Sequence, residues 1–185
     1  MEEYIRKYPE FSLCGLNCSL CSRFHTDGPS RCPGCGGTDF LLKHPTCAII
    51  TCNKKHDNVE FCFECSVYPC KRYQGPSKRD SFISYKNVLD DQGNAKINLQ
   101  SYLNDLKKKQ EHLAELIANY NSGRSKGFYC LAVNLLPISA VDSLMEKIRN
   151  NERISEVNIK EKAQEVTGLI KAEASALNIE LVLRK

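Results

Sequence analysis

Ten of the eleven cysteines in this 185-residue chain lie between positions 14 and 70, and no other feature constrains the fold as strongly. Six of them form three Cys-x-x-Cys pairs, in which two thiolates of one tight turn can bind the same ion. Zinc prefers four such sulfurs in a tetrahedron, so the pattern predicts a metal-binding segment. The ten candidate metal ligands are Cys14, Cys18, Cys21, Cys32, Cys35, Cys47, Cys52, Cys62, Cys65 and Cys70.

Bound metal explains these cysteines better than disulfides do. Residues 1–11 are charged and lack the apolar stretch of a signal peptide, and no apolar run approaches the ~20 residues that span a bilayer. We therefore expect a cytoplasmic protein with no membrane association, in a compartment where thiols stay reduced. The odd cysteine total also fits a disulfide framework poorly.

The expected role of the metal is structural. The cysteine-rich segment has few large apolar side chains and cannot bury much core by itself. Zinc can supply on the order of 10 kcal/mol of folding free energy in such modules. A zinc ion enclosed by four sulfurs has no open position for water or substrate, which argues against catalytic zinc.

The ten sulfurs suffice for two zinc ions, and their partition is open. In a sequential partition, the first site takes the first two Cys-x-x-Cys pairs, and the second site takes the third pair with Cys47 and Cys52. Cys14 and Cys70 are then spare or replace a neighbour. A cross-braced arrangement, in which alternate pairs share an ion, fits the spacing nearly as well. The histidines inside the segment are expected bystanders that could replace a cysteine: His25, His44 and His56.

An iron–sulfur or redox-sensing protein is the alternative to a zinc protein. The spacing Cys14-x3-Cys18-x2-Cys21 is the one with which radical S-adenosylmethionine enzymes bind three irons of a four-iron cluster. Those enzymes continue into a long α/β barrel, whereas this chain continues with more cysteines and then helical patterns. A plain iron–sulfur cluster remains open because thiolates serve iron clusters and zinc alike.

Helical patterns dominate from residue 78 onwards, where Cys130 is the only cysteine. Apolar spacing predicts an amphipathic helix over 99–121 and another over 159–177. A further helix is expected to run to about residue 150 with Ser139 as its N-cap. The apolar stretch 128–136 should be buried, as helix or strand.

Two short elements complete the expected fold. Residues 179–183 largely alternate in polarity and predict a short C-terminal strand. Asn17 is expected to cap a short helix that runs to about Phe24, and residues 1–13 to form a short helix or arm. The predicted class is α+β, mainly α, with a cysteine-rich metal-binding module over 1–77 and a domain of three or four helices over 78–185.

Charge gives little support to a nucleic-acid partner. The formal net charge is +4, but two four-thiolate zinc sites would add about −4 and make the protein roughly neutral. A small basic patch follows the module and is expected to be solvated: Lys71, Arg72, Lys78 and Arg79. We therefore expect a protein partner, with nucleic acid only weakly supported.

No set of residues indicates a reaction. A Ser/His/Asp grouping, a phosphate-binding glycine-rich loop and a catalytic carboxylate pair cannot be singled out, so no catalytic residue is assigned. Cys130 sits in an apolar run and is expected to be a buried small hydrophobe. An enzyme with its site at the domain junction is kept as a further alternative.

The cysteine motifs resemble those of an uncharacterised prokaryotic family called domain of unknown function 3795. The similarity rests on Cys-Gly-Leu-x-Cys-x-x-Cys from Cys14, Cys-x-Gly-Cys from Cys32, the pair Cys47/Cys52, and Cys-x-x-Cys-x-x-Tyr-Pro-Cys ending at Cys70. It covers about residues 12–75. The resemblance implies a small, zinc-binding, cytosolic module with the ten cysteines as ligands, and it implies no activity.

Overall fold

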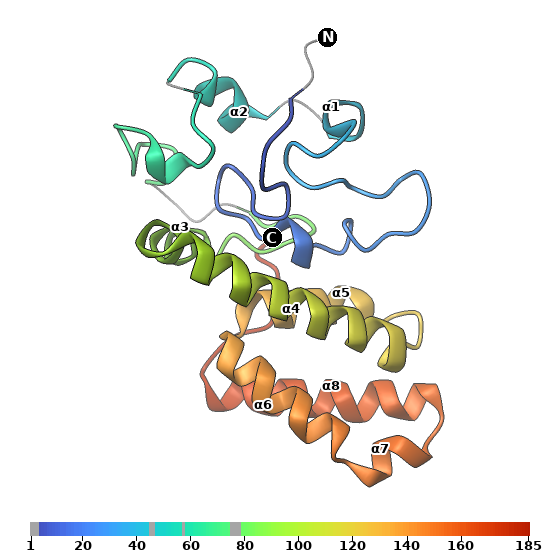
Figure 1. The fold of residues 1–185 in the computed structure, drawn as a ribbon. Helices are drawn as coiled ribbons and strands as arrows, with labels where there is room; N and C mark the ends of the chain where they lie inside the picture. The colour runs from blue at the N-terminus through green and yellow to red at the C-terminus, as the bar shows by residue number, and fades with distance from the viewer. Residues whose placement is uncertain (1–3, 45–46, 57, 75–78) are drawn as a thin grey trace.

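The cysteine-rich segment forms loops and short helical turns on one side of a stack of helices (Figure 1). The computed structural model describes residues 4–44, 47–56, 58–74 and 79–185. The short turns are η1 (Cys18–Leu20), α1 (Phe40–Lys43), α2 (Ala48–Asn53) and η2 (Cys62–Glu64). The stack consists of α3 (Val88–Ile97), α4 (Leu99–Tyr120), α5 (Lys126–Leu135), α6 (Ile138–Arg149), α7 (Glu152–Glu156) and α8 (Ile159–Ala176).

The predicted C-terminal strand is wrong, whereas the mainly helical class is confirmed. About 53 % of the structure is helical and 1 % is strand, and the described residues contain no sheet. Residues 179–183 have no neighbouring strand with which to form a ladder of hydrogen bonds. The tail is held instead by Asp80, whose amide donates to the Arg184 carbonyl at 2.9 Å and whose carboxylate accepts from the Arg184 guanidinium at 2.9 Å.

The two long amphipathic helices are confirmed. Helix α4 buries Leu106, Leu113 and Leu116, which lie three and seven residues apart on one face. Its N-terminus is capped by Asn98, whose side-chain oxygen accepts from the Ser101 amide at 3.0 Å. Helix α8 begins after Asn158, which caps it in the same way.

Other elements differ from expectation in identifiable ways. The stretch 128–136, left open between helix and strand, forms most of α5. Ser139 is not the N-cap of α6, because the helix begins one residue earlier, directly after Pro137. The proline ring fixes φ near the helical value and can start a helix without a side-chain cap. The described part of 78–185 contains six helices rather than three or four, because α3 and α7 have weak apolar patterns.

One hydrophobic core joins the cysteine-rich segment to the helices. Phe11, Leu20 and Phe61 are almost fully buried and belong to the same cluster as the apolar faces of α4, α5, α6 and α8. The ring of Phe11 lies 4.8 Å from that of Tyr102 on α4. A smaller cluster lies within the cysteine-rich segment: Tyr4, Leu13, Cys35, Phe40 and Ile50. The boundary near residue 77 stays a prediction.

In the described part of the chain, no helix has both the length and the apolar character needed to cross a membrane.

Shortening a core leucine of α4 should destabilise the protein strongly. Leu116 is 0 % exposed, so Leu116→Ala should lower the free energy of unfolding by about 2–5 kcal/mol. Leu89 on α3 is 50 % exposed, and Leu89→Ala should stay within about 0.5 kcal/mol. Urea denaturation followed by circular dichroism measures both, and equal losses would show that the α4 face is not the core.

Candidate metal centre and the pocket beside it

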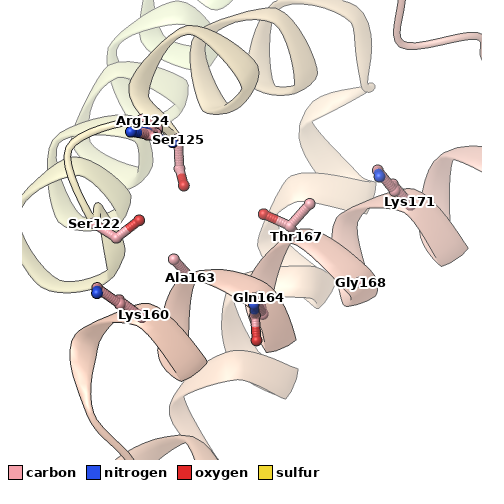
Figure 2. A pocket seen from close by; sticks show the side chains of 9 residues that line it. All are labelled: Ser122, Arg124, Ser125, Lys160, Ala163, Gln164, Thr167, Gly168 and Lys171. Carbon is pink, nitrogen blue, oxygen red and sulfur yellow. The ribbon is translucent and has the colours of Figure 1, made fainter.

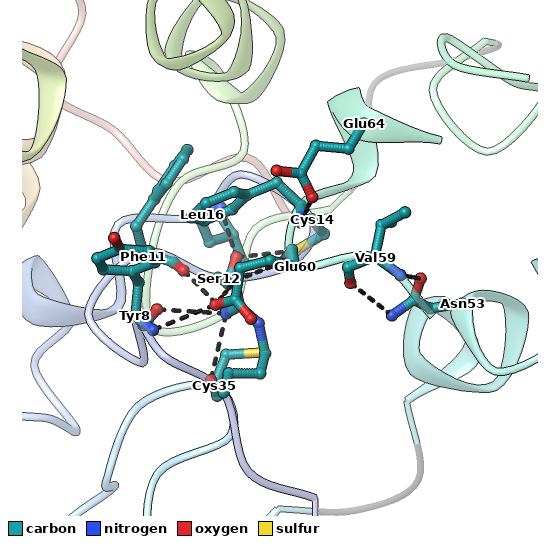
Figure 3. A network of polar contacts seen from close by, with 12 residues as sticks. Tyr8, Phe11, Ser12, Cys14, Leu16, Cys35, Asn53, Val59, Glu60 and Glu64 are labelled. Carbon is teal, nitrogen blue, oxygen red and sulfur yellow. Dashed lines mark hydrogen bonds and ion pairs between the residues drawn. The ribbon is translucent and has the colours of Figure 1, made fainter. Parts of the chain in front are cut away.

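The guanidinium of Arg6 connects three parts of the cysteine-rich segment through their backbone carbonyls. Figure 3 shows the residues that supply these carbonyls, Phe11, Cys35 and Glu60, close to one another. The guanidinium donates to the carbonyl oxygens of Phe11 at 2.9 Å, Cys35 at 3.2 Å and Glu60 at 2.7 Å. It also forms an ion pair with the Glu60 carboxylate at 3.1 Å, and its side chain is 3 % exposed. Gly36 makes room for this side chain, because a Cβ there would lie 2.6 Å from the Arg6 Cγ.

The first sulfur group consists of the residues that the sequential partition assigns to one ion: Cys18, Cys21, Cys32 and Cys35. Burial raises the pKa of the Cys18 thiol well above its ordinary value, and the nearby sulfur of Cys35 raises it further. Burial also raises the pKa of Cys21, while the backbone amides of Arg23 and Phe24 face its sulfur and oppose that effect. Amide hydrogen bonds to sulfur stabilise a thiolate, which is the form that binds metal.

The second sulfur group lines one small cavity of about 30 Å³: Cys52, Cys62, Cys65 and Cys70. Burial raises the pKa of Cys62 to about 12, against a hydrogen bond from the Tyr73 hydroxyl, which lowers it. Cys47 is not in the lining of this cavity and packs against the smaller hydrophobic cluster instead. The lining of this cavity thus includes Cys70 and not Cys47, whereas the sequential partition groups Cys47 with Cys52, Cys62 and Cys65.

Besides Cys47, two further cysteines lie outside these groups. Cys14 is close enough to both Cys18 and Cys62 for its charge to raise the pKa of each thiol. Its sulfur lies 3.2 Å from the Ser12 hydroxyl. Cys130 is 2 % exposed within the main hydrophobic core, so the prediction that it is buried is confirmed.

The three candidate histidines have different surroundings. His25 Nε2 lies 2.6 Å from the Ser19 carbonyl oxygen, and burial lowers the pKa of the His25 ring. His44 stacks on the ring of Phe40. His56 lines the cavity of the second sulfur group, with its Nδ1 3.7 Å from the sulfur of Cys52.

The sulfur atoms do not converge on single points. Among the residues that the structure describes, no three His, Cys, Asp or Glu side chains are grouped so that they could hold one metal ion. All eleven cysteines carry thiols rather than disulfides. The ligand set and its partition therefore stay predictions.

Residues 10–75 match the family described as "Protein of unknown function (DUF3795)". This confirms the resemblance that the cysteine motifs indicated, and the match includes all ten candidate ligands. Neither the curated proteins nor the solved structures compared with the chain gave a match. Residues 10–75 are called the DUF3795 segment below.

A polar network connects the DUF3795 segment to the helices. Asn17 is 2 % exposed, and its side-chain amide donates to the Asp91 carboxylate at 3.1 Å and to the Asn134 side-chain oxygen at 3.4 Å. The Tyr102 hydroxyl donates to the Asn17 side-chain oxygen at 2.8 Å. The prediction that Asn17 caps a helix is wrong, because η1 has only three residues and Asn17 makes no side-chain cap bond.

A pocket of about 500 Å³ opens onto this network, and we call it the junction pocket. It lies where η1, α3, α4 and the start of α6 meet, and its ionisable lining includes Asp90, Asp91, Asp105 and Lys109. Burial raises the pKa of Asp91 to about 6, although a Tyr102 hydrogen bond and the Lys109 charge lower it. Burial lowers the pKa of Lys109, against the charges of Asp91 and Asp105. The pocket thus holds a carboxyl group that can exchange a proton near neutral pH.

A second contact fixes α3 against the turn that carries Cys14. Gln92 is 0 % exposed, and its side-chain amide donates to the Cys14 carbonyl at 2.8 Å and to the Tyr73 hydroxyl at 2.9 Å. Gly15 has φ +93°, and a Cβ there would lie 2.5 Å from the Gln92 Cγ. Sequence reasoning kept a site at the domain junction as an alternative but named none of these residues, because polar positions do not take part in the apolar pattern that locates helices.

Replacing the Arg6 guanidinium by an amine should loosen the DUF3795 segment. Arg6→Lys keeps the charge but loses the planar fork that reaches several carbonyls, so we expect a loss on the order of 2 kcal/mol in unfolding free energy. The control is Arg153→Lys, because Arg153 is in an exposed ion pair with Glu165 and should change stability by less than about 1 kcal/mol. The unfolding free energies of the two variants, each as purified, are compared by urea denaturation. A loss no larger for Arg6→Lys than for the control would contradict the anchoring role.

Proposed function

We propose that this is a cytoplasmic metal-binding protein in which thiolates of the DUF3795 segment bind zinc and hold that segment folded. The observation that carries the proposal is the cavity shared by Cys52, Cys62, Cys65 and Cys70. Four sulfurs are the donor set that structural zinc prefers. The chain segment around them has only a small hydrophobic cluster of its own, so bound metal would supply stability that side-chain packing does not.

The cavity supplies soft sulfur donors, which would have to move closer together to bind one ion. A volume of about 30 Å³ exceeds the ~10–15 Å³ that one water molecule occupies, so there is room for an ion. His56 is held beside Cys52, because its Nδ1 donates to the Cys52 carbonyl at 2.9 Å, and the Tyr73 hydroxyl can donate a hydrogen bond to the Cys62 sulfur. Cys18, Cys21, Cys32 and Cys35 are proposed for a second ion, since amide groups already face two of these sulfurs.

The metal-stabilised segment is proposed to present a surface to a protein partner. Three large apolar side chains on and beside it are exposed: Ile5 at 57 %, Leu42 at 73 % and Val67 at 54 %. Such side chains favour protein contacts over nucleic acid. The basic patch gives little support to nucleic acid, because the Arg72 guanidinium is already hydrogen-bonded to the Cys52 sulfur. Lys78 lies outside the described residues.

An iron–sulfur cluster is the alternative occupant of the same thiols. Thiolates bind both zinc and iron clusters, and a cluster would supply one-electron transfer or redox sensing. The colour of the protein separates the two, because iron–sulfur clusters absorb visible light and zinc thiolates do not.

Metal content tests the proposal and the role of Cys70 together. Anaerobically purified protein should be colourless and contain about two zinc ions, at four thiolates for each. Cys70→Ser should lose about one of them, whereas the sequential partition leaves Cys70 spare and predicts no loss. Cys130→Ala, in the helical core, should keep both ions. Elemental analysis gives the counts. Protein without bound metal would end the proposal, and brown, iron-containing protein would replace zinc by the alternative.

The junction pocket favours a second candidate function, an enzyme or small-molecule site between the DUF3795 segment and the helices. Its volume of about 500 Å³ falls within the range of ligand pockets. The mostly buried carboxyl of Asp91 costs stability at neutral pH, and such costs often mark functional sites. Three carboxylates against one lysine favour a cationic ligand: Asp90, Asp91 and Asp105 against Lys109.

Replacing Asp91 should change the pH dependence of stability. Since its pKa in the folded protein, about 6, lies above the ordinary value of 3.8, the folded state binds more protons than the unfolded state between these values. Wild-type protein should therefore lose stability relative to Asp91→Asn as the pH rises from about 4 to about 6. At pH 7 the variant should be more stable by on the order of 2 kcal/mol. Urea denaturation across this range measures the difference, and a constant difference would contradict the raised pKa.

A further inference from the structure

A groove of about 780 Å³ runs between α8 and the loop that joins α4 to α5, outside the DUF3795 segment (Figure 2). We call it the basic groove. Its functional groups are three cations, three hydroxyls and one amide: Arg124, Lys160, Lys171, Ser122, Ser125, Thr167 and Gln164. None of its lining residues is acidic. The groove therefore has a concentrated positive charge that no carboxylate in its walls offsets.

The cations of the basic groove differ from two cations of α6 that have carboxylate partners. Lys147 pairs with Glu173 at 2.9 Å, and Arg149 pairs with Glu115 at 2.6 Å. In contrast, no ion pair within the described residues involves a cation of the groove, although the Lys171 amine lies over the ring of Phe128. The positive charge of the groove is therefore available to an anionic ligand.

The two walls of the groove meet at a buried tyrosine. Tyr129 is 0 % exposed, and its hydroxyl donates to the Tyr120 carbonyl at 2.9 Å. Burial raises the pKa of this hydroxyl, whereas Ser125 and Thr167, one from each wall, both lie close enough to the tyrosine to lower that pKa. Figure 2 shows these two side chains directed into the space between the walls. Hydroxyl groups from both walls therefore lie on either side of the same buried tyrosine.

The loop wall adds backbone donors to the side chains. The side-chain oxygen of Asn121 accepts from the amides of Gly123 and Ser125, both at 3.1 Å, and so shapes the loop. Helix α5 begins directly after Ser125, whose hydroxyl makes no cap bond to the helix. The first amides of a helix point outward from its positive end and attract negative charge.

We propose that the basic groove binds the phosphate group of a small phosphorylated molecule. Three cations supply the charge, hydroxyls from both walls can donate hydrogen bonds to phosphate oxygens, and the groove has the volume of a small-molecule site. The three cations line one groove of small-molecule size, which suits a compact phosphorylated ligand. This inference is independent of the metal proposed above, because every residue in it belongs to the helical part of the chain.

The test is a titration of the full-length protein, as purified, with inorganic phosphate. Backbone amide shifts in NMR should change saturably at residues 122–128 and 160–171. The double variant Arg124→Gln, Lys160→Gln should weaken the apparent affinity about tenfold, because both side chains are exposed cations of the groove. The matched control is Lys147→Gln, which removes a cation that already has a carboxylate partner, and it should leave the affinity unchanged.

Three outcomes would overturn the proposal. Shifts that grow without saturation, or that lie elsewhere in the chain, would show that the groove does not select phosphate. An equal loss of phosphate affinity in the Lys147→Gln control would show that the effect comes from overall charge and not from the groove. A single-stranded oligonucleotide that shifts the same amides at lower concentration than inorganic phosphate would assign the groove to a nucleic-acid backbone. Circular dichroism of the variants separates loss of binding from loss of fold, because substitutions of exposed side chains should leave the helical signal intact.

Discussion

The arrangement of the cysteine-rich segment depends on one buried positive charge. The guanidinium of Arg6 donates hydrogen bonds to the backbone carbonyls of Phe11, Cys35 and Glu60. These three residues are far apart in sequence. A buried charge is costly unless it is paired and hydrogen-bonded, so each of these carbonyls is held where Arg6 needs it. In this segment the Arg6 side chain thus holds distant parts of the chain together, as a hydrophobic core does in a larger domain. Any metal bound by the nearby thiols would further stabilise a segment that the hydrogen bonds of Arg6 already hold together.

The contact between the DUF3795 segment and the helices is both apolar and polar. Phe11, Leu20 and Phe61 enter the core of the helical stack, and Asn17 and Gln92 carry buried hydrogen bonds across the same boundary. Apolar burial supplies most of the stabilisation, whereas buried polar groups require a specific geometry because an unpaired group is costly. This explains how a segment made largely of loops can be held in one orientation. The hydrogen bond from the Gln92 side chain to the Cys14 carbonyl also fixes the position of Cys14 relative to α3.

Sequence alone predicted the parts of the structure that follow a regular pattern. The apolar spacing of Leu106, Leu113 and Leu116 located α4 within one residue at its C-terminus, and the cysteine motifs identified the family. The C-terminal strand failed because alternation describes one strand and says nothing about whether a partner lies beside it. The replacement of Cys47 by Cys70 in the cavity could not be read from spacing, since it depends on how α2 and the chain after η2 fold back. The junction pocket and the basic groove are assembled from distant positions and have no local signature.

The pairing of Asp80 with Arg184 has a consequence for how the chain matures. The Asp80 carboxylate is fully buried, and hydrogen bonds from Arg184 and the Tyr85 amide overcome the cost of burial and lower its pKa to about 2. Its partner is synthesised 104 residues later. On the ribosome, the segment around Asp80 therefore emerges long before its counter-charge exists, and the carboxylate must stay hydrated until the helices have been made. The ion pair that joins both ends of the helical part forms only after Arg184 has left the exit tunnel.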